Sequence, residues 1–113
     1  LAAVIVSFFI IQVAVKQLKE CIDELLERSL PDDIEQDITR IVLSFEGVSQ
    51  PHHLRTRRIG SHYAIDIHVR MDGNISLREA HDKATAIEMK LKEAYGKGTY
   101  INIHVEPKKV SNE

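Results

Sequence analysis

The sequence predicts an α+β domain in which two helices cover one face of a three-stranded mixed sheet, with a long helix leading into it. Two observations support this fold class. After residue 30, a segment with apolar residues three to four positions apart, as in a helix, is followed by two segments with apolar residues at every second position, as in strands. One further segment of helical spacing and one of alternating spacing then follow. Glycine, proline or Asp-Gly-Asn separates these segments, as expected at turns. The 113 residues suffice for one such domain with one core.

Residues 1–15 are apolar except for Ser7 and Gln12. As a helix they would rise about 22 Å, which is less than the ~30 Å hydrocarbon core of a bilayer. They also lack the basic start and the small-residue cleavage site of a secretory signal. We expect residues 1–15 to be the C-terminal part of a transmembrane helix, since a domain of this size has little interior for so apolar a helix. A buried helix of a soluble domain is the alternative.

A basic segment follows, with Lys16 and Lys19 where a helix would leave the membrane on the cytoplasmic side. Helical spacing of apolar residues continues as far as Pro31, which disfavours helix for the residue before it. Residues 16–30 are therefore predicted to be a helical linker, and residues 31–113 a separate domain.

The first helix of this domain is predicted to begin at Asp32 or Asp33, either of which can cap it, and to end at Gly47. Its apolar stripe consists of Ile34, Ile38, Ile41, Val42 and Phe45. Residues 48–58 then indicate an extended segment that Pro51 interrupts.

The second half of the domain contains a strand, a helix and a strand. Residues 62–71, HYAIDIHVRM, alternate as a strand. Ser76 and Glu79 then form a capping box that opens a helix. Its apolar stripe consists of Leu77, Ala80, Ala84, Ile87, Leu91 and Ala94. After two glycines, the stretch YINIHVEPKK at residues 100–109 supplies the last strand, which its proline ends.

The order of these elements is αββαβ. The first two strands are close enough in sequence to form a hairpin, whereas the second and third are joined through a helix and should lie parallel. The result is an open version of the ferredoxin-like arrangement, with two helices on one face of the sheet and none left to cover the other.

Composition excludes several classes of function. The net charge is −2 and there is no tryptophan, so we expect no nucleic-acid partner. Cys21 is the only cysteine, which rules out an internal disulfide and a CxxC site. No nucleophile–base pair is evident, so we do not expect an enzyme. The six histidines are the feature of the composition that needs an explanation.

Strand parity places some of these histidines. In the second strand Asp66, His68 and Arg70 fall on the face opposite to the helices, and in the last strand His104 and Glu106 do so. Because neighbouring strands lie about 4.8 Å apart, His68, His104 and Glu106 can converge. Two imidazoles and a carboxylate suit a borderline divalent metal, zinc first. Each histidine alone would more often be a surface residue.

The other histidines are less clearly placed. His81 lies near the start of the second helix of the domain, from where it could approach one end of the sheet. Strict alternation sends His52 towards the core and His53 to the open face, but Pro51 breaks the regularity there. Spacing alone does not choose between the two. His62, beside a turn, is expected to be merely exposed.

Several motifs occur together and in one order. They are the stalk ELLERSLPDDIEQDI, the strand segment FEGVSQPHHLRTRRIGSHYAIDIHV, the helix start SLREAH and the final strand INIHVEP. In this combination the chain resembles the C-terminal cytoplasmic domain of the cation diffusion facilitator family, the zinc-exporting metal/proton antiporters. The resemblance covers nearly the whole chain. It implies an αββαβ, metallochaperone-like module that follows the last membrane helix of a multi-pass protein, in a prokaryotic inner membrane.

The resemblance also implies a metal site and a partner. Matched motif by motif, the ligands are His52, His68, His81, His104 and Glu106, and His52 is favoured over His53. Family members commonly have Asp in place of Glu106. Two copies of the domain associate as a homodimer and bind zinc or another divalent metal at and near their interface. The transport-site residues of the family lie in earlier membrane helices, outside this sequence.

Three functions follow as expectations. In the first, residues 31–113 are a cytoplasmic metal-binding regulatory and dimerisation domain of a divalent metal/proton antiporter for zinc efflux, and cytosolic metal stabilises the active dimer. The alternative is a stand-alone metallochaperone-like protein that transfers metal to a partner. A third is a small-molecule regulatory module of similar layout, in which the histidines are incidental.

Overall fold

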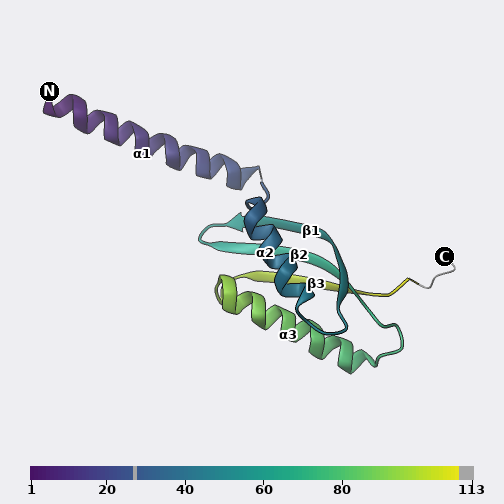
Figure 1. Cartoon of the computed structure of the whole chain (residues 1–113). Helices are drawn as coiled ribbons and strands as arrows, with labels where there is room; N and C mark the ends of the chain where they lie inside the picture. Colours follow the sequence, from purple (N-terminus) through teal and green to yellow (C-terminus); the bar gives the residue numbers. More distant parts are fainter. Residues whose placement is uncertain (27, 110–113) are drawn as a thin grey trace.

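The computed structural model describes residues 1–26 and 28–109. Along the chain it contains α1 (Ala2–Leu25), α2 (Asp32–Leu43), β1 (Ser49–Ile59), β2 (His62–Met71), α3 (Leu77–Tyr95) and β3 (Tyr100–Pro107) (Figure 1). The domain is therefore αββαβ, with a separate long helix before it.

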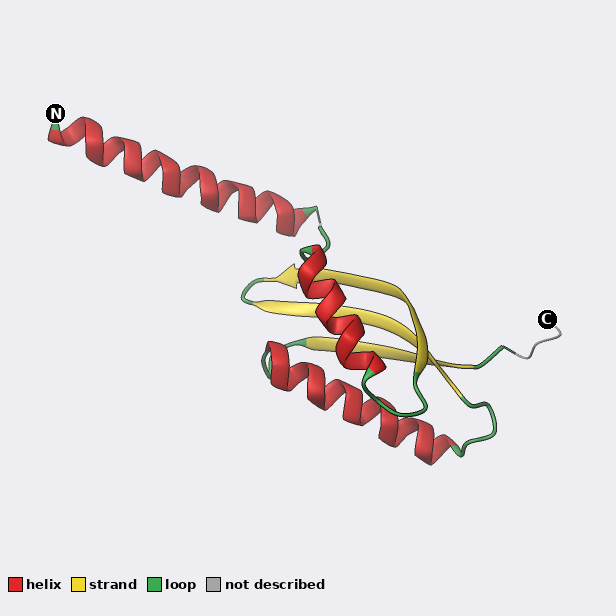
Figure 2. Cartoon of the chain, in the orientation of Figure 1, coloured by secondary structure: helices red, strands yellow, loops and turns green. Residues whose placement is uncertain are grey.

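The three strands form one sheet in the order β1-β2-β3. β1 pairs antiparallel with β2, whereas β2 pairs parallel with β3. Both α2 and α3 lie on the same face of this sheet (Figure 2). The predicted α+β class and the open ferredoxin-like arrangement are confirmed, and the described chain places no helix over the other face.

The core lies between the sheet and these two helices. β2 contributes every second side chain and the helices contribute side chains three to four positions apart, so the two periods meet at one interface. The largest fully buried members are Ile38 and Val42 of α2, Ile87 and Leu91 of α3, and Ile65, Ile67, Val69 and Met71 of β2. Because these side chains point to the helices, the intervening residues of β2 lie on the open face of the sheet.

Local sequence accounts for the starts of the helices in the domain. The side chain of Ser76 accepts a hydrogen bond from the backbone N–H of Glu79 (3.1 Å), which confirms the predicted cap of α3. α2 begins at Asp32, but Pro31 is its N-cap residue and no described side chain caps it. The prediction that Asp32 or Asp33 caps this helix is therefore wrong. Both lie in its first turn, where carboxylates interact favourably with the helix dipole.

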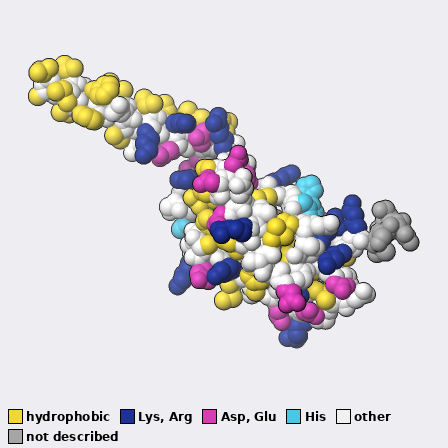
Figure 3. Space-filling model, in the orientation of Figure 1, with side chains coloured by type: hydrophobic (Ala, Val, Ile, Leu, Met, Phe, Trp, Pro, Cys, Tyr) yellow, Lys and Arg dark blue, Asp and Glu magenta, His cyan; other side chains and the backbone are white. Residues whose placement is uncertain are grey.

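α1 extends away from the domain, and none of its residues is buried. It has 24 residues, and an 18-residue window of it has a mean hydropathy of 1.6, so it is long and apolar enough to cross a membrane. Figure 3 shows apolar side chains along its free end and charged side chains near its junction with the domain. The assignment of residues 1–15 to a membrane span remains a prediction.

The junction between α1 and the domain differs from the predicted helical linker. α1 ends at Leu25 rather than continuing to residue 30. Leu30 is only 5% exposed, and its backbone N–H donates to Oγ1 of Thr56 (2.9 Å). The helix thus ends before Leu30, which packs into the domain. At the same junction the N–H of Gly60, in the β1–β2 turn, donates to Oε1 of Glu24 (2.5 Å).

Candidate metal centre

Three histidines lie side by side across the open face of the sheet. His52 on β1 is paired with His68 on β2, and His68 is paired with His104 on β3. The ring centroids of His52 and His68 are 5.3 Å apart, and those of His68 and His104 are 4.6 Å apart. His68 and His104 thus lie where strand parity predicts them.

Two irregularities in β1 bring His52 to this face. Between Ser49 and His52, and again between His52 and Arg55, β1 uses one residue more than β2. These β-bulges contain the positive φ angles of Gln50 (46°) and His53 (47°). Each extra residue reverses the side-chain parity of the strand. His52 therefore lies on the open face, although strict alternation from the regular part of β1 sends it towards the core.

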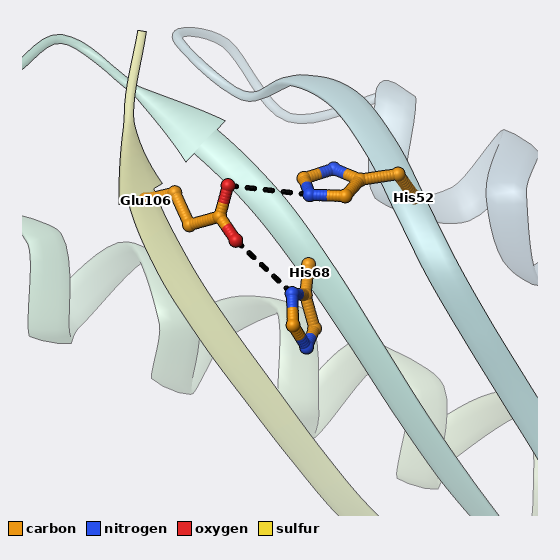
Figure 4. Close-up of side chains that lie close together, drawn as sticks. All are labelled: His52, His68 and Glu106. Carbon is orange, nitrogen blue, oxygen red and sulfur yellow. Dashed lines mark hydrogen bonds and ion pairs between the residues drawn. The ribbon is translucent and has the colours of Figure 1, made fainter.

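The carboxylate of Glu106, one same-face position beyond His104 on β3, joins this row of histidines (Figure 4). Its Oε1 lies 3.1 Å from Nδ1 of His68, and its Oε2 lies 3.2 Å from Nε2 of His52. Nε2 of His104 is 3.9 Å from Oε1. Nη2 of Arg70 is 3.1 Å from Oε2. We call His52, His68, His104 and Glu106 the histidine–carboxylate cluster.

The donor atoms of the cluster have the spacing that a divalent metal requires. One ligand atom each from His52, His68 and Glu106 lie within 4.8 Å of one another, and all three residues are partly buried. Zinc binds imidazole nitrogen and carboxylate oxygen at about 2.0–2.2 Å, so tetrahedral ligand atoms stand roughly 3.4 Å apart. The two N–O separations of 3.1 and 3.2 Å are already close to that value. Nitrogen and carboxylate donors also suit zinc chemically.

The backbone of the first bulge orients His52. Its Nδ1 lies 2.8 Å from the carbonyl oxygen of Gln50. A carbonyl oxygen can only accept, so Nδ1 carries the proton of this hydrogen bond. In a neutral ring, Nε2 is then a lone pair that faces Oε2 of Glu106 across 3.2 Å. Two acceptors at that distance require a cation between them, either a proton on Nε2 or a metal ion.

Glu106 is poised to act as an anionic ligand. Its burial opposes ionisation, but the hydrogen bond from His68 and the positive charges of His52 and Arg70 outweigh that effect. Together they hold the pKa of Glu106 below its ordinary value. The carboxylate is therefore ionised at neutral pH.

Two neighbours of the cluster, His53 and Arg70, are expected on the open face but are not among the predicted ligands. The ring centroid of His53 lies 5.1 Å from that of His52 and 5.1 Å from that of His68, because the second bulge exposes it beside them. Arg70 is the register partner of Glu106 on the adjacent strand. The proline before the two adjacent histidines is the one sequence signal for an irregular strand, and it does not specify which histidine turns outward.

His81 is not part of the cluster. It lies exposed on α3, which covers the opposite face of the sheet. Among the described residues, the group that could hold a metal ion does not include it. Within one protomer the sheet separates His81 from the other four predicted ligands, so its role as a ligand stays a prediction that requires a second copy of the chain.

These features define a class of protein, a small open ferredoxin-like domain that follows an apolar helix and carries a candidate metal centre on its uncovered sheet face. Residues 30–108 match the family model of the cation efflux protein cytoplasmic domain, and the chain belongs to this family. The family predicted from the sequence motifs is confirmed.

The curated relatives are cation efflux pumps. The chain is 36% identical over 102 residues to the cation-efflux pump FieF of Escherichia fergusonii, and equally to that of Salmonella typhimurium. The alignments cover 90% of this chain and 34% of each relative. The chain thus spans about a third of the length of these relatives.

Solved structures of transporter domains are similar to this one. The metal-bound C-terminal domain of the CzcD transporter from Thermotoga maritima is 32% identical, with a TM-score of 0.61 over 66% of this chain and 87% of that chain. The cytosolic domain of a cation diffusion facilitator family protein is also 32% identical, with a TM-score of 0.61 over 66% of this chain and 89% of that chain. The first of these is a domain of a transporter, and the second is a domain of a cation diffusion facilitator family protein.

Proposed function

We propose that this chain is the cytoplasmic regulatory and dimerisation domain of a divalent-cation efflux transporter and that cytosolic zinc binds its histidine–carboxylate cluster. In this proposal α1 is the end of the last membrane helix of a metal/proton antiporter in the cell membrane. Membership of the family supports the transporter context. The observation that carries the metal site is the 3.2 Å separation between Nε2 of His52 and Oε2 of Glu106, with Nδ1 of His52 already bonded to the carbonyl oxygen of Gln50.

The proposed centre takes one ligand from each strand of the sheet. His52 on β1, His68 on β2 and Glu106 on β3 supply the inner donors, and His104 stands at the rim with 60% of its side chain exposed. When bound, zinc supplies a dication that neutralises the carboxylate and replaces protons between the donors. The carbonyl oxygen of Gln50 keeps His52 in the tautomer that the metal requires.

The homodimer is the second part of the proposal. The inner cluster offers three ligand atoms, whereas a closed zinc site takes four. The fourth must come from His104, from water or from a second copy of the chain. His81 faces away from the cluster, so it could serve as a ligand only across a dimer interface. A metal ion bound by two copies would stabilise the dimer arrangement that it binds more tightly. The zinc concentration would then influence the geometry of the dimer.

β1 offers a physical route from the centre to the membrane helix. It carries His52 near one end, and near the other it carries Thr56, which accepts a hydrogen bond from the Leu30 N–H. The turn after β1 contributes the Gly60 N–H that donates to Glu24 of α1. A shift of β1 on metal binding would therefore act directly on the end of α1.

Calorimetric titration of the 113-residue chain with zinc in detergent micelles tests the proposal. Changing both His104 and Glu106 to alanine should remove most high-affinity binding, because it removes the carboxylate and the rim imidazole. His62→Ala is the matched control, since His62 is exposed and lies at the other end of β2. Unchanged binding in the double variant would show that the centre is misplaced.

Sedimentation in the same detergent, with and without a chelator, tests the dimer. We expect zinc to favour the dimer and the chelator to favour the monomer. A chain that stays monomeric with zinc bound would contradict the dimerisation part of the proposal and leave the metal site standing.

A further inference from the structure

Arg70 is held beside the cluster at two points. Its Nη2 lies 3.1 Å from Oε2 of Glu106, and its Nη1 donates to the carbonyl oxygen of Pro107 at 3.1 Å. Its side chain is only 16% exposed, so the guanidinium group is not free to move into solvent. Because a guanidinium group stays protonated in proteins, this arrangement places a permanent positive charge next to the proposed metal position.

With its imidazoles neutral, as metal binding requires, the centre already has balanced charges. The carboxylate of Glu106 carries one negative charge, Arg70 carries one positive charge, and neutral imidazoles carry none. A divalent cation would therefore enter a centre that has no net negative charge to attract it. Without Arg70, the same centre would have a net charge of about −1, by the side-chain charges alone.

Two effects of Arg70 on metal binding have opposite signs. Its hydrogen bond to Oε2 holds the carboxylate of Glu106 in place, which favours binding, whereas its charge repels the incoming ion. The repulsion involves a doubly charged ion a few ångströms away and declines only inversely with distance. An ion pair between partly exposed side chains contributes little by comparison. The repulsion is therefore the larger effect.

We propose that Arg70 sets the affinity of the metal centre, because its fixed charge weakens zinc binding by at least about tenfold. The domain would then respond to raised cytosolic zinc and remain metal-free when zinc is scarce. This inference rests on the proposed function, since it concerns the same centre.

The test compares the zinc Kd of four versions of the 113-residue chain in detergent micelles, measured at pH 7.5 by competition with a chromophoric chelator. Arg70→Gln removes the charge and keeps a hydrogen-bond donor for the carboxylate. Arg70→Lys keeps the charge. Arg55→Gln is the matched control, because it removes a charge from the same sheet face at a position paired with Asp66 and outside the cluster.

We expect Arg70→Gln to bind zinc at least about tenfold more tightly than wild type, with Arg70→Lys and Arg55→Gln within about threefold of it. Equal or weaker binding by Arg70→Gln, with wild-type binding intact, overturns this inference and leaves the proposed function standing. Absence of zinc binding by wild type overturns both. Arg70→Met, which has neither charge nor donor, replaces Arg70→Gln if that variant does not fold, and is likewise expected to bind more tightly.

Discussion

Zinc binding should weaken steeply as the pH falls, by an amount that depends on the number of imidazole ligands. Nε2 of His52 and Nδ1 of His68 must both be unprotonated to bind a metal ion. An ordinary imidazole, which titrates near pH ~6.5, is about 91% unprotonated at pH 7.5 and about 9% at pH 5.5. Each such ligand therefore weakens binding about tenfold over this range. Two imidazoles predict a loss of about 100-fold, and a third from His104 would add about another factor of ten.

Glu106 should add nothing to this pH dependence. Its neighbours hold its pKa below the ordinary glutamate value, so the carboxylate is ionised at both pH values. It would protonate, and cease to be an anionic ligand, only in more acid solution. A loss of affinity between pH 7.5 and 5.5 is therefore attributable to the histidines.

The assay is calorimetric zinc titration of the full chain in detergent at both pH values, for wild type and for His52→Ala. The variant has one imidazole fewer at the centre, so its loss of affinity between the two pH values should be about tenfold smaller than that of wild type. Equal wild-type affinities at the two pH values would refute histidine ligation. The same pH dependence in wild type and variant would refute the assignment of His52.

Two further predictions concern contacts that hold the domain together. The Tyr95 hydroxyl donates to Asp37. Burial and this contact raise the pKa of Tyr95, and this contact together with Arg40 lowers the pKa of Asp37. Tyr95→Phe should therefore lower the free energy of unfolding most between about pH 4 and 10. Below this range the unfolded chain takes up a proton at Asp37, and above it the unfolded chain loses the Tyr95 proton, so in both cases the contact stabilises the fold less. A difference in urea unfolding that is constant with pH would contradict this. Thr56→Val leaves the Leu30 N–H without its acceptor and should lower the free energy of unfolding by about 1–3 kcal/mol. A change below about 0.5 kcal/mol in urea unfolding would show that this contact is dispensable.

Local patterns in the sequence were sufficient for the architecture. The alternation in residues 62–71 places His68 on the open face because the intervening apolar residues have one face to occupy, the one covered by helices. The same reasoning holds for His104 and Glu106 on β3, and the capping box at Ser76 is a contact between near neighbours. Each of these features depends on residues a few positions apart, so period and turn chemistry are enough to predict them.

Strand periodicity could not decide how His52 and Arg70 come to lie beside His68, His104 and Glu106, and only the motif match favoured His52 over His53. His52 reaches the open face because two bulges shift β1 against β2, and such register shifts depend on pairing between strands rather than on the residues of one strand. Arg70 meets Glu106 for a similar reason, since parallel pairing across the α3 crossover sets their register. His81 lies on the helix side of the sheet, which its motif alone does not reveal. Strand periodicity thus assigns side chains to a face, but contacts between residues distant in sequence determine which of them meet.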